Sequence, residues 1–145
     1  MSGGLVSVGY AGRTVDELLE RLHEAGATAL VDVRLNPWSR QPGFSKKGLG
    51  AALETAGIAY VHEPTLGNPK DNRAAFARDD AAAWQHLRDR FEHEGAEALA
   101  RLIDRAHGER VAVMCLERNP AHCHRHLVVD MARELAPDLS VTEIP

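Results

Sequence analysis

The sequence predicts an α/β fold, a three-layer α/β/α sandwich around a mostly parallel sheet of about five strands. Short apolar runs alternate along the chain with segments whose apolar residues recur at helical spacing, which is typical of βαβ units. The run at residues 111–116 is apolar at every position, as expected for a strand that helices cover on both faces. The 145 residues contain no repeat or linker, so a single domain over residues 1–145 is predicted.

Five apolar runs are predicted to be the strands of this sheet. The first ends at Gly9, and the last is short, which is typical of an edge strand. The predicted strands cover residues 5–8, 29–33, 58–61, 111–116 and 139–142.

Helical patterns fill most of the sequence between these runs. A helix is predicted to begin after Thr14, because Glu17 three residues later completes a capping box, and to end at Gly26. The stretch from 64 to 80 is predicted to be irregular, because glycine, proline and asparagine interrupt it. The other predicted helices lie around residues 49–56, 84–91 and 99–106, with Gly95 between the last two, and from a loop at Asn119 and Pro120 to about Leu135.

The composition limits the classes of function. A formal net charge of −4 argues against a general nucleic-acid coat. No apolar run approaches the roughly 20 residues of a membrane helix, and the first residues lack the basic and apolar segments of a secretory signal. Two cysteines are too few for a disulfide scaffold and suit a reducing compartment. We therefore expect a cytoplasmic protein with no membrane partner.

Most reactive side chains follow the predicted strands. In open parallel sheets, ligands bind beyond the carboxyl ends of the strands, where the loops converge. The sequence therefore predicts one polar site at that edge of the sheet. The residues concerned are Tyr10 and Arg13 after the first strand; Asp32, Arg34, Trp38, Ser39 and Arg40 after the second; His62 and Glu63 after the third; and Cys115, Glu117, Cys123, His124 and Arg125 after the fourth.

The segment from Arg34 to Lys47 is basic and contains no acidic residue. Guanidinium groups bind phosphate or carboxylate, and the aromatic faces of Trp38 and Phe44 could stack on a base. One interpretation is an anion or nucleotide site, with Ser45 starting a helix whose N-terminus faces the ligand. The other is a solvated loop whose aromatic residues pack on the core.

Asp32 and Arg34 are two apart on a strand, so their side chains share a face. A buried carboxylate needs a partner, because an unpaired charge there is costly. A structural pair with Arg34, Arg40 or Arg125 is one interpretation. The other is that Asp32 orients a catalytic histidine or acts as a base.

Three interpretations remain open for Cys115, Cys123 and His124. His124 shares the apolar stripe of the last predicted helix and should point inward, whereas His122 and His126 should face water. The cluster could hold a reactive thiolate, whose pKa nearby arginine and histidine would lower. It could instead bind zinc, although it lacks the paired Cys-x-x-Cys of strong zinc motifs. The third interpretation is purely structural packing.

The sequence lacks the common catalytic motifs of α/β proteins, including the Cys-x₅-Arg phosphatase loop, because Ala121 stands where that loop needs arginine. Several other sequence blocks occur in order along the chain. They are Ser7-Val8-Gly9-Tyr10 with Arg13, Asp32-Val33-Arg34 with Pro37, Ser39-Arg40 and Phe44, Leu66-Gly67-Asn68, and Cys115-x-Glu117 with Cys123-His124-Arg125. Together these blocks resemble the family called domain of unknown function 488. This resemblance implies a small α/β domain without a settled activity. It groups Arg34, Arg40, Cys115, Glu117, Cys123, His124 and Arg125 as one constellation.

The leading hypothesis is an enzyme acting on an anionic, phosphate-bearing ligand such as a nucleotide or a nucleic-acid end. Catalytic roles are predicted for Cys115 or Cys123, tuned by His124, with Asp32 and Glu117 as carboxylates. The alternatives are a non-catalytic nucleotide or nucleic-acid binding module that uses the Arg34–Lys47 segment, and a zinc-stabilised interaction domain; no cofactor is otherwise predicted. The predicted ligand-binding residues are Tyr10, Arg13, Arg34, Trp38, Ser39, Arg40, Phe44 and Arg125.

Overall fold

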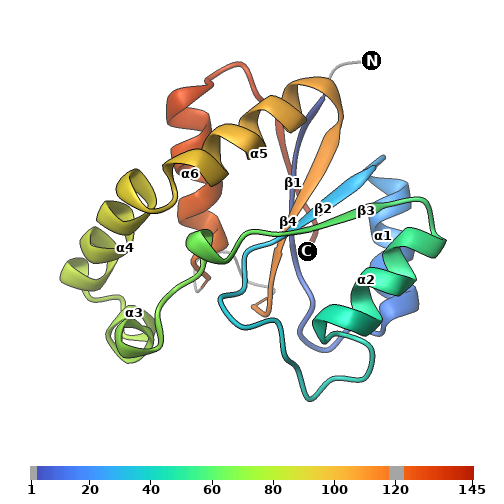
Figure 1. Cartoon of the computed structure of the whole chain (residues 1–145), viewed down its shortest axis with the longest axis horizontal. Coiled ribbons are helices and arrows are strands. Elements are labelled where there is room, and N and C mark those ends of the chain that lie inside the picture. The colour runs from blue at the N-terminus through green and yellow to red at the C-terminus, as the bar shows by residue number, and fades with distance from the viewer. Residues whose placement is uncertain (1–2, 118–122) are drawn as a thin grey trace.

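The computed structural model describes residues 3–117 and 123–145 and contains one five-stranded sheet (Figure 1). The strand order is β3-β2-β4-β1-β5, and every pair of neighbours is parallel. The predicted α/β fold is therefore confirmed, and the sheet is parallel throughout. The strands are β1 (Gly4–Gly9), β2 (Ala29–Asp32), β3 (Ala59–His62), β4 (Arg110–Cys115) and β5 (Val141–Glu143).

The strand register brings the predicted site residues to one edge of the sheet. Gly9 at the end of β1 pairs with Cys115 at the end of β4. Asp32 at the end of β2 pairs with Met114 of β4 and with His62 of β3. Because β4 lies between β1 and β2, its last residue, Cys115, lies at the middle of this carboxyl edge.

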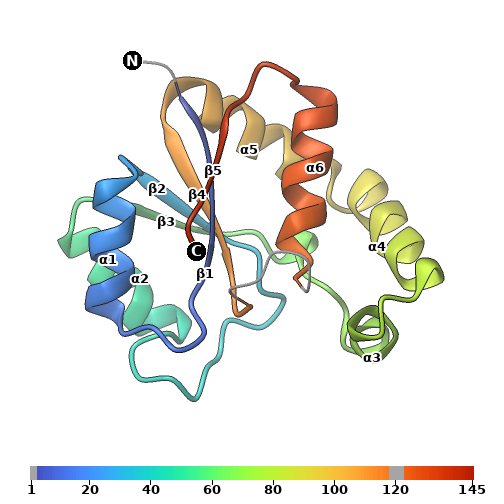
Figure 2. The ribbon, with the colours of Figure 1, turned by 180° about the vertical axis from the view of Figure 1, so that it is seen from behind.

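Helices cover both faces of the sheet, which gives the predicted three layers (Figures 1 and 2). On one face, α1 (Val15–Glu24) and α2 (Lys46–Thr55) bury leucines against β1 and β4. On the other face, α5 (Ala96–Gly108) and α6 (Arg125–Leu135) pack on the sheet, and α3 (Arg73–Ala77) and α4 (Ala81–His93) extend this layer outward. The core therefore consists of two apolar clusters separated by the sheet.

The first helix begins and ends as the sequence predicts. The Thr14 side chain accepts a hydrogen bond from the backbone N–H of Glu17, and the Glu17 carboxylate accepts one from the backbone N–H of Thr14. Gly26 follows the helix at a φ of 74°, a left-handed conformation that glycine adopts without steric cost. The two ends thus fix how α1 leaves β1 and returns to β2.

The stretch from 64 to 80 contains more helix than predicted. It forms two short 3₁₀ turns, η1 (Pro64–Leu66) and η2 (Lys70–Asn72), followed by α3. Phe76 explains the helix, because its buried ring packs at 4.3 Å from the ring of Trp84 on α4. The prediction of an irregular segment was therefore wrong for Arg73–Ala77.

The other predicted elements are present with small shifts at their ends. The last helix ends at Leu135, as predicted, and the fifth strand forms an edge of the sheet at 141–143. The predicted loop at 119 and 120 lies outside the described residues. Among the helices in the described ranges, none is long and apolar enough to cross a membrane.

Candidate functional site

A pocket of about 300 Å³ opens at the carboxyl edge of the sheet. Segments far apart in the sequence line it: the ends of β1, β2 and β4, the turn before η2, helix α3 and the residues before α6. Seven predicted site residues line this pocket, and eight others do not. Those in the lining are Tyr10, Arg34, Trp38, Cys115, Glu117, Cys123 and His124. Those outside it are Arg13, Asp32, Ser39, Arg40, Phe44, His62, Glu63 and Arg125.

Asp32 and Arg34 form a buried ion pair, as one interpretation of the sequence predicted. The Arg34 guanidinium donates from Nε to Oδ1 of Asp32 at 2.9 Å and from Nη2 to Oδ2 at 2.7 Å. The carboxylate accepts two more hydrogen bonds, from the backbone N–H of Arg34 and from the hydroxyl of Tyr60. Burial, and then the hydrogen bond to Asp32, raise the pKa of Tyr60. Asp32 therefore holds Arg34 in place. Because its carboxylate already accepts four hydrogen bonds, this geometry does not favour Asp32 as a catalytic base.

Most of the Arg34 donors are used inside the protein. Besides the two bonds to Asp32, Nη1 donates to the Tyr10 hydroxyl at 3.3 Å and to the Phe44 carbonyl at 2.6 Å. The rings of Tyr10 and Phe44 stack at 4.5 Å, and Phe44 is fully buried. Phe44 therefore packs in the core, whereas Trp38 is 62% exposed at the rim of the pocket.

Arg13 and Arg125 are also buried and paired. Arg13 donates to the carbonyls of Gly9 and Pro145, which joins the end of β1 to the end of the described chain. The Arg125 guanidinium is fully buried and donates to the Ser7 hydroxyl, the Glu143 carboxylate and the Glu117 carbonyl. Burial lowers the pKa of Arg125, which Glu143 partly offsets.

Arg125 also donates a hydrogen bond to the sulfur atom of Cys115. Its Nη1 donates to Sγ of Cys115 at 3.4 Å. A fixed guanidinium at this distance favours the thiolate form of a cysteine. Arg125 therefore lies behind the sulfur that lines the pocket and not beside a ligand in it.

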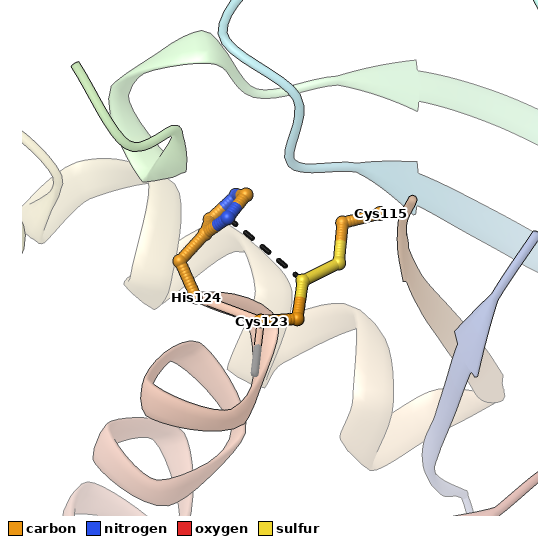
Figure 3. A group of neighbouring side chains, drawn as sticks. All are labelled: Cys115, Cys123 and His124. Atoms are coloured by element: carbon orange, nitrogen blue, oxygen red, sulfur yellow. Dashed lines mark hydrogen bonds between the residues drawn. A yellow bond between two sulfur atoms is a disulfide. The ribbon is translucent and has the colours of Figure 1, made fainter. Parts of the chain in front are cut away.

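Cys115, Cys123 and His124 form one cluster at the pocket (Figure 3). The two cysteines are joined by a disulfide, and Nδ1 of His124 lies 3.9 Å from Sγ of Cys123. Nε2 of His124 lies 2.7 Å from the Val33 carbonyl, which can only accept, so Nε2 carries the proton and Nδ1 has a free lone pair. The prediction that His124 points inward is confirmed by its hydrogen bond to the Val33 carbonyl.

The same three residues are the candidate metal ligands of the described chain. Their ligand atoms all lie within 4.8 Å of one another. A histidine whose other ring nitrogen donates to a backbone carbonyl is the usual arrangement in metal sites. A metal would need both cysteines as thiolates, so the zinc alternative stays a prediction for the reduced chain.

The surroundings of His124 predict a pH dependence of stability. Burial, followed by the charges of Arg73 and Arg125, lowers the pKa of His124 to about 4. Because the unfolded chain binds this proton near pH 6.5 and the folded chain does not, stability should fall as the pH drops from about 6.5 toward 4. We expect urea unfolding to give about 2 kcal/mol less stability at pH 5 than at pH 7 from this residue alone.

The control for this prediction is His124→Gln, which keeps an amide N–H for the Val33 carbonyl but does not titrate. Its loss of stability between pH 7 and pH 5 should be smaller than that of the wild type by this amount. Equal losses in the two proteins would contradict the assignment.

The sequence reasoning missed two donors in the pocket, Arg73 and Asn68. Arg73 begins α3 and donates from Nε to the Asn68 carbonyl at 3.1 Å, while its two Nη groups carry no hydrogen bond to the described residues. The Asn68 side chain is 94% buried and accepts through Oδ1 from Asn72, and its Nδ2 donates to no described residue. No buried polar side-chain atom in the described ranges lacks a partner, and Asn68 lines the pocket, so its amide is available to a ligand there.

The rest of the basic segment lies away from the pocket lining. Arg40, Lys46 and Lys47 are exposed. Ser39 accepts a hydrogen bond from the backbone of Gln41, and Ser45 begins α2 as predicted, though outside the pocket. These residues form a solvated surface next to Trp38.

The histidines flanking the cluster were predicted to face water. His126 does so and pairs with Asp130 at 3.3 Å. His122 lies outside the described residues.

The family model for the domain of unknown function DUF488 matches residues 14–132, a span that includes the pocket residues Arg34, Arg73, Cys115, Cys123 and His124. The chain belongs to this family. No curated protein matches this DUF488 chain.

Two crystal structures resemble the DUF488 chain in fold. Both are of a protein from Shewanella putrefaciens CN-32 described as a "Putative phosphatase (DUF442)". Each matches with 18% sequence identity and a TM-score of 0.51, covering 94% of this chain and 68% or 70% of the other. At this identity the likeness establishes a shared fold.

Proposed function

We propose that this DUF488 protein is an enzyme that acts on a phosphate-bearing ligand in the pocket at the carboxyl edge of the sheet. The observation that carries the proposal is the position of unused donors beside a reactive cluster. Arg73 and Asn68 line the same pocket as Cys115, Cys123 and His124, and the Arg73 Nη groups and the Asn68 Nδ2 donate to no described residue. An anion bound by the donors would therefore lie next to the sulfur atoms.

Arg73 and Asn68 supply the anion site in this proposal. A guanidinium offers paired N–H donors that match two phosphate oxygens, and the amide adds a third donor. The bond from Nε of Arg73 to the Asn68 carbonyl holds the two residues together. Arg34 contributes mainly by anchoring the wall of the pocket, because Asp32 neutralises its charge.

Cys115 is the nucleophile in the reduced chain, because Arg125 favours its thiolate. The thiolate forms a bond from sulfur to phosphorus as the bond from phosphorus to the leaving oxygen breaks, and that oxygen takes a proton from solvent. Water then breaks the sulfur–phosphorus bond, its proton passes to the Glu117 carboxylate at the pocket, and phosphate leaves. His124 keeps a neutral Nδ1 beside Cys123, where it can accept a hydrogen bond from the Cys123 thiol.

Two further observations support this substrate class. The structures with a similar fold belong to a protein described as a putative phosphatase, which agrees with phosphate chemistry on this scaffold. Trp38 and Leu116 are exposed apolar side chains in the pocket lining, and a planar base could stack on the indole. We therefore propose a nucleotide or the end of a nucleic acid as the ligand, in the cytoplasm.

The test is hydrolysis of a chromogenic aryl phosphate by the reduced protein, with Arg73→Gln as the variant. Losing charged hydrogen bonds to phosphate should lower kcat/KM by about 10- to 100-fold. The matched control is Arg78→Gln, at the end of the same short helix, exposed and outside the pocket lining. Equal activity in both variants, or no hydrolysis by the wild type, would contradict the proposal.

A second candidate function is binding of nucleic acid without catalysis, through the Arg34–Lys47 segment. The observation that favours it is the exposed group of Arg40, Lys46 and Lys47 beside Trp38. Such binding should weaken steeply with salt and survive the loss of either cysteine. A nucleic-acid affinity that does not change with ionic strength would exclude it.

A further inference from the structure

The disulfide at the pocket uses both cysteines of the chain, Cys115 and Cys123. We infer that this pair is a reversible oxidation site, which hydroperoxides convert from dithiol to disulfide through the pocket and low-mass thiols convert back. The inference rests on the proposed function in one respect only: the disulfide form has no free thiolate to attack phosphorus. The redox chemistry itself does not depend on the substrate.

The pocket is the route to the two sulfur atoms. Cys115 and Cys123 are 1% and 4% exposed, and both line the pocket. Cys115 is the last residue of β4, and Cys123 lies two residues before α6. Since the rest of each side chain is covered by protein, a small oxidant or reductant must enter where the phosphate-bearing ligand would bind.

The two sulfur atoms have different neighbours, and this difference indicates which cysteine reacts with the oxidant first. The Arg125 guanidinium donates to Sγ of Cys115, so Cys115 is the stronger candidate for the thiolate. Cys123 instead faces the neutral Nδ1 of His124, which brings no positive charge to stabilise a thiolate. Cys115 is therefore the sulfur that attacks an oxidant, and Cys123 is the sulfur that resolves the product.

The oxidation balances with one hydroperoxide. The Cys115 thiolate attacks the outer oxygen of the hydroperoxide and the oxygen–oxygen bond breaks, which gives a sulfenic acid at Cys115. The departing alkoxide takes a proton from solvent and leaves as the alcohol. The Cys123 thiol then attacks the Cys115 sulfur, the sulfur–oxygen bond breaks, and the thiol proton leaves with the hydroxyl group as water. Two electrons pass from the two thiols to the peroxide. The reverse step uses two molecules of a low-mass thiol, which leave as their own disulfide.

The experiment counts free thiols in the folded wild-type protein. Because the chain has two cysteines, the assay reports on this pair alone. We expect two reactive thiols per chain after reduction, none after one equivalent of hydrogen peroxide, and two again after a low-mass thiol. Non-reducing peptide mapping should link the peptides that hold Cys115 and Cys123. Persistent thiols, disulfide-linked dimers, or zinc retained with both thiols unreactive would each overturn the inference.

Single variants test the direction and separate this inference from the proposed function. In the Cys123→Ser variant, peroxide should leave a sulfenic acid at Cys115, which a dimedone probe labels. The same probe should label the Cys115→Ser variant far less. Stronger labelling of Cys115→Ser would overturn the assigned direction. Inorganic phosphate should slow oxidation of the wild type if it fills the pocket. Reversible oxidation that phosphate does not slow would still support the redox pair and would count only against the proposed function.

Discussion

Replacing Arg34 with methionine is expected to lower the free energy of unfolding by about 3–5 kcal/mol, the usual cost of leaving a buried charge without its partner. Asp32 is fully buried and receives two of its four hydrogen bonds from this guanidinium. The substitution also removes the donor to the Phe44 carbonyl, which ties the loop before α2 to the sheet. Urea unfolding monitored by circular dichroism measures the change.

Two further variants test whether the buried charge of Asp32 causes this loss of stability. The double variant Asp32→Asn with Arg34→Met removes both charges and should recover much of the lost stability, because a neutral pair leaves no buried charge. Arg40→Met, at an exposed position of the same loop, should change stability by no more than about 0.5 kcal/mol. A double variant as unstable as the single one would show that packing, and not charge, decides the outcome.

Replacing Cys115 with serine is expected to lower aryl phosphate turnover by at least about 10³-fold, the scale seen when a covalent nucleophile is removed. Serine is nearly isosteric, but its hydroxyl does not ionise near neutral pH as a thiol does. The reduced wild type is the reference, since the disulfide form lacks a free sulfur. Steady-state kinetics under reducing conditions measure the effect, and the melting temperature verifies the fold.

Cys123→Ser decides which sulfur reacts. If Cys115 attacks phosphorus, the Cys123 variant keeps more turnover than the Cys115 variant, because Arg125 still faces the nucleophile. The opposite ranking would assign the nucleophile to Cys123, beside His124. Full turnover in both variants would rule out thiol catalysis at this site.

The sheet and the place of the site could be predicted from the sequence, because both follow from local patterns. Apolar runs of strand length and helical spacing define the elements, and parallel strands place their carboxyl ends together. The capping box at Thr14 and the inward position of His124 are likewise local. These features do not depend on which strands become neighbours.

The roles of the arginines could not be predicted in the same way, because they depend on distant partners. Arg125 reaches Ser7 in β1 and Glu143 in β5, and Arg13 reaches Pro145. A sequence shows that a guanidinium is present but not whether a carboxylate far along the chain will neutralise it. The geometry therefore favours structural roles for residues that were predicted to hold the ligand.

The anion donors were missed for a related reason. Arg73 lies in a segment with turn-forming residues, and the tertiary contact between Phe76 and Trp84 that supports α3 is not visible in the local sequence. Asn68 does belong to the Leu66-Gly67-Asn68 block quoted for the family resemblance. That block was the one signal that could have placed Asn68 at the site.

The central position of β4 has a consequence for how the chain folds. β1 and β2 are not neighbours, and the strand that joins them starts at Arg110, about three quarters of the way along the chain. During synthesis β1 and β2 therefore emerge from the ribosome before β4, the strand that pairs with both of them. The sheet can form only late, through contacts between residues far apart in the sequence. We expect a slow, concerted folding step in which the nascent chain acquires protease resistance only after β4 has emerged.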